Sequence, residues 1–355
     1  MKEIRSIVYV GIYPAKAPRD NVYLAELKKR GVVLYEFVSS APGLAKYREL
    51  YRNLRREATD SDAIWVGYLS PMVVPVAYLA RGKRKIVYNA LGSAYEAYVL
   101  DRAVCKPYSF KALSFWFFDF LSFHLAHTIL VESEAQRRFL AKTFFVSLKK
   151  LVTVYTSVDE EIFHPDPQVR KQETFAVMFR GMFIPATGVE IVLEAAKLLK
   201  DEPIRFIISG WGQLKDEVVS FIERNKLKNV ELNTVFLEPD ALRGKLLSAH
   251  VLLGQFSTNT RLERTIQHKN SEALALGQPL ITRDSASNRE VFEDGVNCLF
   301  VRAGDAEALA EKIIYAREHP EVLKRLATGA FQTYREKLSA QVLGEQISSI
   351  LKSHV

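Results

Sequence analysis

The sequence predicts an α/β protein built from two Rossmann-like domains that face each other across a cleft. The chain has 355 residues, which is more than one hydrophobic core usually serves. Apolar runs rich in β-branched and aromatic residues alternate with helical patterns along the whole chain. Such runs are typical of parallel strands covered by helices on both faces, and they occur equally often in the two halves.

Each expected strand is a short apolar run bounded by turn residues or helix starts. The first half holds six such runs, at residues 4–10, 32–38, 63–68, 85–89, 127–132 and 151–155. The second half holds six more, at residues 175–181, 204–210, 230–235, 250–256, 279–282 and 298–301. Clear helical patterns lie between them, at residues 22–31, 188–201 and 305–320.

Two domain boundaries follow from breaks in this alternation. Charged residues and two prolines interrupt the pattern over residues 159–173. We therefore expect an N-terminal domain over residues 1–162 and a second domain over residues 163–338. Residues 339–355 form one more amphipathic helix, which we expect to return to the N-terminal domain.

The aromatic segment 109–131 is the one stretch that could be mistaken for a membrane span. Lys111, Asp119, His124 and His127 interrupt it, and its apolar length is well below the roughly 20 residues that a spanning helix needs. The segment is therefore interpreted as a buried helix that leads into a strand. Its two histidines are expected to serve the core or the surface rather than catalysis.

The composition is that of a soluble globular protein, with 48% hydrophobic and 25% charged residues. Cys105 and Cys298 match no metal or redox spacing, which indicates a reduced, cytoplasmic compartment. The first residues lack the apolar region and cleavage site of a signal peptide.

The formal net charge of +8 lies entirely in the first half of the chain. Residues 1–162 hold 24 Lys and Arg against 16 Asp and Glu, whereas residues 163–355 hold 25 of each kind. A one-sided excess favours an anionic partner. No nucleic-acid motif accompanies it, so nucleic acid is not expected as the partner, and a membrane surface or an acidic substrate is left.

The segment 43–57 is the part of the basic half that could meet a membrane. If it is helical, Leu44, Tyr47, Leu50, Tyr51 and Leu54 form one apolar stripe between cations, which is the layout of an interfacial helix. The helix then lies on the inner face of an anionic membrane. Alternatively, the stripe packs on the N-terminal sheet and the cations are solvated.

Lys269 and Glu272 lie three residues apart at the start of a short expected helix, so that their side chains share a face. Gly277 ends that helix, and Pro279 opens a short strand. By itself the pair fits an ordinary surface ion pair as well as a binding site.

The residues before this helix point to a nucleotide. Arg261 and Arg264 precede it, and cationic side chains suit a diphosphate, whose charge grows when it leaves. A carboxylate such as Glu272 suits the paired hydroxyls of a ribose. Two strand-to-helix turns, one over residues 181–188 and one after Gly210, add helix N-termini that favour anions.

With these residues, the second half resembles the donor domain of the retaining family-four glycosyltransferases, which have two Rossmann-like domains in the GT-B arrangement. The resemblance starts at 152–165, which looks like the family's linker ending in Phe-x-Pro, and runs through 181–196 to the block 268–316. Residues 11–32 resemble the family's acceptor side.

The resemblance implies an enzyme that moves a sugar from a UDP- or GDP-sugar to a glycan or lipid-linked acceptor, with retention at the anomeric carbon. No metal or other cofactor is implied, because cationic side chains stabilise the leaving diphosphate. Arg264 and Lys269 take that catalytic role. Donor binding is assigned to Gly181, Thr187, Gly188, Gly210, Phe236, Ser257, Thr258 and Glu272. Acceptor binding is assigned to Gly11, Tyr13, Arg19, Asn89 and Ser93.

The sequence also departs from the family pattern. The family carries a Glu eight residues before the position of Glu272, where this chain has Arg264, and Glu263 can take that place only if the loop bulges. The usual Gly-Arg and Lys-Gly phosphate pair is replaced by residues 181–182 and 187–188, and Arg180 precedes the glycine instead.

These departures keep a second hypothesis open. In it the chain is a degenerate glycosyltransferase that binds without turnover and serves as a scaffold for an active partner. Many family members also carry a histidine in the segment where this chain has Asn89. The enzyme hypothesis does not require this histidine if the leaving phosphate takes the proton of the acceptor hydroxyl.

Overall fold

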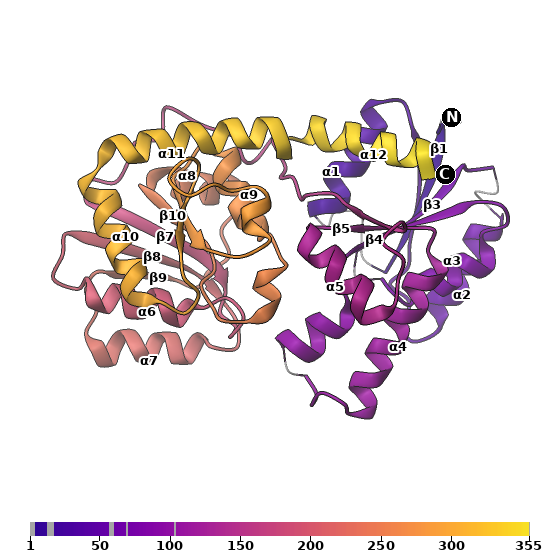
Figure 1. Ribbon diagram of the computed structural model, residues 1–355, viewed down its shortest axis with the longest axis horizontal. Coiled ribbons are helices and arrows are strands. Elements are labelled where there is room, and N and C mark those ends of the chain that lie inside the picture. Colours follow the sequence, from indigo (N-terminus) through magenta and orange to yellow (C-terminus); the bar gives the residue numbers. More distant parts are fainter. Residues whose placement is uncertain (1–3, 13–17, 57–59, 69, 103, 355) are drawn as a thin grey trace. The chain divides into compact units, whose positions relative to one another are not determined.

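The computed structural model describes residues 4–12, 18–56, 60–68, 70–102 and 104–354. The chain forms two compact units. Unit 1 comprises Met1–Ser157 and Ala340–Val355, and unit 2 comprises Val158–Ser339. Each unit contains one six-stranded sheet flanked by helices, as Figure 1 shows. The predicted α/β class with two Rossmann-like domains is therefore confirmed. For comparison, the sequence placed the boundaries after residues 162 and 338.

In unit 1 all neighbouring strands pair in parallel. Their order across the sheet is β2 (Val33–Val38), β1 (Ser6–Gly11), β3 (Ala63–Val66), β4 (Lys85–Leu91), β5 (Thr128–Val131) and β6 (Leu151–Thr153). The central strands β3 and β5 are buried at every residue, which explains their unbroken apolar sequences. All six expected strands of the first half are present.

Helices cover both faces of this sheet (Figure 1). One face carries α1 (Pro18–Lys29) and α12 (Ala340–His354), which share a hydrophobic core with the sheet. The other face carries α2 (Ala45–Arg56), α3 (Val73–Ala80), α4 (Phe110–Leu125) and α5 (Glu134–Phe144). A short π-helix, η1 (Glu96–Asp101), follows β4.

Unit 2 repeats the design with its own parallel sheet. The strand order is β12 (Leu299–Val301), β11 (Leu280–Arg283), β10 (Val251–Leu253), β7 (Phe175–Met182), β8 (Ile204–Trp211) and β9 (Val230–Asn233). The α-helices are α6 (Val189–Leu198), α7 (Lys215–Asn225), α8 (Pro239–Ser248), α9 (His268–Ala275), α10 (Ala306–Glu318) and α11 (Pro320–Thr333). Short helical turns are η2 (Thr260–Glu263), η3 (Asn288–Glu290) and η4 (Tyr334–Leu338). The six expected strands of the second half are present.

The apolar stripe of α2 packs on the sheet of unit 1. Leu50 and Leu54 are fully buried in the core, and Tyr47 packs against it. The structure therefore favours the alternative, in which the stripe packs on the sheet, and leaves only Leu44 and Tyr51 of the stripe exposed. The cations Arg48 and Arg52 lie on the exposed side of the helix.

The aromatic helix α4 corrects a second expectation. It does lead into β5, as predicted, but it is not a buried helix: Phe110, Leu113 and Phe117 are all exposed. None of the helices in the described part of the chain is long and apolar enough to span a bilayer.

Strands β7 and β8 approach each other closely where both carry glycine. Gly181 and Gly210 are register partners, and a Cβ atom on Gly210 would lie 1.8 Å from the Gly181 carbonyl oxygen. No side chain fits there without moving the backbone. The approach brings the carboxyl ends of the two strands together.

We predict that Gly210→Ala lowers the free energy of unfolding by about 1–3 kcal/mol or more, because the new methyl group overpacks the contact between β7 and β8. Gly244→Ala is the matched control, since Gly244 lies in α8 with open space around its Cβ position. It should raise stability by up to about 1 kcal/mol through helix propensity. Urea unfolding followed by circular dichroism tests both, and equal midpoints for the two variants would contradict the prediction.

Candidate nucleotide-binding site

The candidate site lies at the carboxyl edge of the unit 2 sheet, where β7, β8 and β10 end and α9 begins. Parallel strands present their carboxyl ends at one edge, and ligands of such sheets bind there. Sequence-predicted residues at this edge come from three segments: the end of β7, the loop after β10, and the first turn of α9. The folding of one sheet therefore gathers residues that are up to 91 positions apart in sequence.

Glu272 is the centre of a charged cluster. Its side chain is 4% exposed, and its Oε1 accepts a hydrogen bond of 3.1 Å from Arg180 Nη2 at the end of β7. His268 Nδ1, one turn earlier on α9, lies 2.9 Å from the same oxygen. Both contacts use Oε1 and hold the carboxylate in one orientation.

The cations around Glu272 decide its protonation. Burial by itself would raise the pKa of the Glu272 carboxyl, but Arg180, His268 and Lys269 together lower that pKa below its usual value. The residue is therefore an anion at neutral pH despite its burial.

The pKa of Lys269 is also lowered, which in a lysine favours the uncharged form. Burial and the nearby Arg180 guanidinium lower the pKa of the Lys269 ammonium to about 8, with Glu272 opposing them. Its Nζ lies 3.0 Å from the position that a Cβ of Gly181 would occupy. The missing side chain at Gly181 thus gives the lysine room beside the β7 backbone, where any larger residue would push it away.

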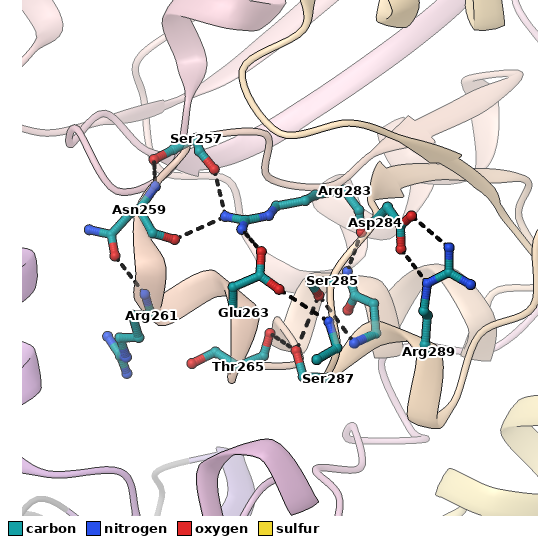
Figure 2. Close-up of polar contacts among 12 residues, drawn as sticks. Ser257, Asn259, Arg261, Glu263, Thr265, Arg283, Asp284, Ser285, Ser287 and Arg289 are labelled. Carbon is teal, nitrogen blue, oxygen red and sulfur yellow. Dashed lines mark hydrogen bonds and ion pairs between the residues drawn. The ribbon is translucent and has the colours of Figure 1, made fainter. Parts of the chain in front are cut away.

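The loop before α9 is held by a buried arginine, Arg283, at the end of β11 (Figure 2). The Arg283 side chain is 4% exposed. Its Nη1 donates to the carbonyl oxygens of Ser257 (2.7 Å) and Asn259 (2.9 Å). Its Nη2 pairs with the carboxylate of Glu263 at the end of η2. One side chain therefore sets the path of the loop from Ser257 to Glu263.

This arrangement answers whether Glu263 can replace the glutamate that the family pattern expects. Glu263 Oε1 pairs with Arg283, and Oε2 accepts a hydrogen bond of 3.3 Å from the Ala286 amide. The carboxylate is used to join the loop to the segment after β11. The suggested compensation by Glu263 therefore has no support in the structure, and Arg264, which directly follows η2, keeps the position eight residues before Glu272.

Several predicted donor residues have structural duties of their own. Thr187 Oγ1 donates to the Met182 and Ile184 carbonyls and closes the loop after β7. Gly188, at the N-cap of α6, has a φ of +73°, and a Cβ there would lie 2.3 Å from the Ser257 amide nitrogen. Thus the glycine loop and the Ser257 loop touch backbone to backbone, and these residues shape the edge of the site.

Other predicted donor residues face solvent. Thr258 is exposed beside Gly304, whereas Ser257 is buried and its Oγ accepts from the Asn259 amide. Phe236 lies in the segment between β9 and α8, is 68% exposed, and pairs with the half-exposed Trp211 at the end of β8, with ring centroids 6.1 Å apart. Two exposed aromatic rings at a strand edge offer a surface on which a planar base can stack.

Three of the predicted acceptor-binding residues in unit 1 have buried polar side chains. Arg19 and Asn89 are buried and bonded to each other, with Arg19 Nε 2.9 Å from Asn89 Oδ1, and Asn89 also donates to Asp20. These contacts attach α1 to the sheet, and the acceptor role of Arg19 and Asn89 stays a prediction. Ser93 is also buried, where its Oγ accepts from the Glu96 amide at the start of η1.

The two remaining acceptor predictions lie at the end of β1. Gly11 is the last residue of that strand and is buried. Tyr13 lies outside the described residues. Their acceptor role stays a prediction.

Sequence reasoning missed His268, Arg283 and Trp211. His268 could have been found, because it stands four residues before Glu272 on the same helix face. Arg283 could not, because its partners Ser257 and Asn259 are more than 20 residues away and the contact exists only when β11 lies beside β10.

The chain has two Rossmann-like units, each with one sheet of parallel strands, and a charged site at the carboxyl edge of the second sheet. This combination defines a protein of the GT-B class. Residues 160–333 match the family described as glycosyl transferases group 1. The matched residues cover nearly all of unit 2.

A curated relative matches the same class. WcaL of Salmonella typhimurium, whose name links it to colanic acid biosynthesis, is 25% identical over 170 residues. The match covers 47% of this chain and 42% of WcaL, so that this chain spans less than half the length of that relative.

Two solved structures extend the likeness to the whole fold. The Anabaena protein Alr3699/HepE, solved in complex with UDP, superposes with a TM-score of 0.76 at 15% identity, over 98% of this chain and 100% of that one. A sucrose-phosphate synthase from Thermosynechococcus elongatus reaches 0.78 at 13% identity, with 98% of each chain covered. At such identities the likeness shows the GT-B fold.

We predict that Arg283→Ala lowers the free energy of unfolding by about 2–4 kcal/mol, because it leaves two carbonyls and part of a carboxylate without their buried donor. Arg289→Ala is the matched control. Arg289 makes a bidentate pair with Asp284 at 2.6 and 2.7 Å, but its side chain is 63% exposed, so the change should lower stability much less than Arg283→Ala does. Denaturant unfolding measures both, and equal losses would show that Arg283 does not hold the loop.

Proposed function

We propose that this protein is a glycosyltransferase that moves a sugar from a UDP- or GDP-sugar to a glycan or lipid-linked acceptor, with retention at the anomeric carbon and without a metal. The observation that carries the proposal is the cluster of Arg180, Lys269 and buried Glu272 at the carboxyl edge of the unit 2 sheet. The group 1 match and the UDP bound by the similar Anabaena protein support a nucleotide-sugar donor.

In this proposal different side chains bind the ribose, the diphosphate and the base of the nucleotide. Glu272 Oε1 is held by Arg180 and His268, so Oε2 can accept a hydrogen bond from a ribose hydroxyl. The protonated Lys269, together with Arg264, stabilises the diphosphate as its negative charge grows. The exposed rings of Trp211 and Phe236 supply a surface for the base.

The transfer then needs no protein base. The bond between the anomeric carbon and the diphosphate oxygen breaks while an acceptor hydroxyl attacks the same face of the sugar. The leaving phosphate oxygen takes the hydroxyl proton, and the electron pair of the broken bond stays on the diphosphate. Lysine and arginine supply the positive charge that a metal supplies in other transferases.

The scaffold hypothesis keeps one specific observation in its favour. Arg264 stands at the family's glutamate position, and the neighbouring Glu263 is bound by Arg283, so the usual carboxylate contact with the donor sugar has no replacement from this loop. A scaffold of this kind binds nucleotide but releases none from a nucleotide sugar.

The proposal is tested in two stages with the full chain. Thermal shifts against UDP, GDP, ADP and TDP identify the base, because a bound nucleotide raises the melting point according to its concentration and affinity. Incubation with the corresponding nucleotide sugars then measures slow release of the nucleotide, and NMR of the product reports the anomeric configuration. Binding without release would favour the scaffold, and inversion would refute retention. Activity that disappears with EDTA and returns with a divalent ion would refute metal independence.

Glu272→Gln should weaken nucleotide binding by about 1–3 kcal/mol, the range for a hydrogen bond to a charged group. The variant removes the negative charge that orients Arg180 and accepts from the ribose. Glu307→Gln is the matched control, since Glu307 is an exposed glutamate in the first turn of α10. Isothermal titration with the nucleotide identified above measures both, and unchanged affinity in Glu272→Gln would remove the ribose assignment.

Nucleotide affinity should fall as pH rises through about 8, because the lowered pKa of Lys269 turns the ammonium into a neutral amine there. From about pH 7 to about pH 9 the loss should be about tenfold, in proportion to the protonated fraction. Lys269→Arg, which stays charged, should bind equally well across this range.

Lys269→Ala serves as the control for titration of other groups. It should bind weakly at every pH and show no midpoint near 8. The same midpoint in Lys269→Ala as in the native protein would assign the titration to another group.

The sequence-based expectation of a cytoplasmic location stays a prediction. The two cysteines, Cys105 and Cys298, are unpaired in the structure. A biosynthetic role in polysaccharide assembly fits the name of the relative WcaL and is part of the same proposal.

A further inference from the structure

Helix α4 turns an aromatic and cationic face outward, and we propose that this face docks unit 1 on an anionic lipid surface. Figure 1 shows α4 at the periphery of its unit. The inference concerns the binding surface alone and does not depend on the proposed transferase activity. It moves the expected membrane contact from α2, which buries Leu50 and Leu54 in the core, to a different helix.

The exposed apolar side chains on and before α4 are large and lie close together in sequence. Tyr108 is 98% exposed, Phe110 is 88%, Leu113 is 58% and Phe117 is 51%. Positions 110, 113 and 117 follow the i, i+3, i+7 spacing of one helical face. Monomeric proteins rarely leave such a set of large apolar residues uncovered, so this face is an interaction surface.

Buried polar contacts on the opposite face fix the orientation of α4. Asp119 is fully buried, and its two carboxylate oxygens accept from the Ala94 amide (3.1 Å) and the Tyr95 amide (2.7 Å). Ser122, also buried, donates to the Pro71 carbonyl at 2.6 Å. Turning the helix to bury Phe110 or Phe117 would break these hydrogen bonds. The outward aromatic face is therefore built into the fold.

The turn before α4 adds to the surface. Tyr108 has a φ of +66°, a left-handed conformation that residues other than glycine rarely adopt. The next residue, Ser109, caps the helix by accepting a hydrogen bond from the Ala112 amide. The turn therefore places the exposed Tyr108 ring directly beside the start of α4.

The charges around the face identify its partner. Residues 102–118 include Arg102, Lys106 and Lys111 and contain no Asp or Glu, and all three cations are exposed. Aromatic rings flanked by Lys and Arg are the composition of surfaces that enter the headgroup region of anionic membranes. A symmetric contact between two copies of the chain would instead bring these cations against each other without a carboxylate between them.

The test is co-sedimentation of the full chain with vesicles of phosphatidylcholine alone or mixed with phosphatidylglycerol, at low and high salt. The native protein should bind the anionic vesicles and release at high salt. The triple variant Phe110→Ser, Leu113→Ser, Phe117→Ser and the double variant Lys106→Glu, Lys111→Glu should each lose about tenfold or more of that binding. Since all these side chains are exposed, unchanged thermal melting and nucleotide-induced shifts should confirm that both units stay folded.

Two controls make the result specific to α4. Leu79→Ser removes an exposed apolar side chain on α3 (72% exposed), and Arg48→Glu with Arg52→Glu reverses two exposed cations on α2. Both should bind vesicles within about twofold of the native protein. Absence of native binding, equal losses in controls and α4 variants, or lipid-free self-association that the triple variant abolishes would each overturn the proposal. The last result would assign the face to a second copy.

Discussion

The site in unit 2 depends on keeping one buried carboxylate ionised. Moving an isolated charge out of water costs many kcal/mol, so Glu272 can remain an anion only if cations and hydrogen-bond donors surround it. Arg180 arrives from the end of β7, and His268 and Lys269 arrive from the first turn of α9. This requirement ties the end of a strand to the start of a helix 90 residues later. The same cations that stabilise the carboxylate are then in place for the phosphates of a nucleotide.

Unit 1 also buries a carboxylate, but there the balance of burial and hydrogen-bond donors differs. Asp20 is fully buried and accepts hydrogen bonds from the Trp65 indole, the Tyr68 amide and the Asn89 side chain, with Arg19 beside it. Burial raises its pKa, and these donors oppose the rise. Here the buried polar groups hold helix α1 on the sheet. Two polar clusters of similar composition thus have different uses, because one is sealed inside a unit whereas the other lies where strands end and loops open.

Apolar residues show the same separation between composition and use. Helix α2 has the stronger amphipathic pattern in sequence, yet its stripe disappears into the core at Leu50 and Leu54. Helix α4 buries Asp119 and Ser122 and exposes Phe110 and Phe117. Burial also raises the pKa of Asp119 to about 7, which shows how strongly its carboxylate has been withdrawn from water. A polar residue can be buried where backbone amides donate hydrogen bonds to it. Because those hydrogen bonds fix the orientation of the helix, the aromatic residues on its other face remain exposed.

The sequence by itself determined the architecture. All twelve strands, the class of fold and the pairing of Lys269 with Glu272 on one helix face follow from patterns within short windows, because strand and helix periodicities are local properties. His268 belongs to the same window and could have been added. The departures from the family pattern around Arg264 were also visible in the sequence.

Only the tertiary structure decided which partners these residues meet. Glu263 binds Arg283 rather than a sugar, Asn89 is sealed against Arg19, and the exposed apolar face belongs to α4. Each outcome depends on contacts between segments that lie 20 or more residues apart in sequence. Patterns within a short window of sequence do not predict such contacts. The physical reason is that burial belongs to the packed assembly: a side chain is inside or outside only after the other elements have taken their places.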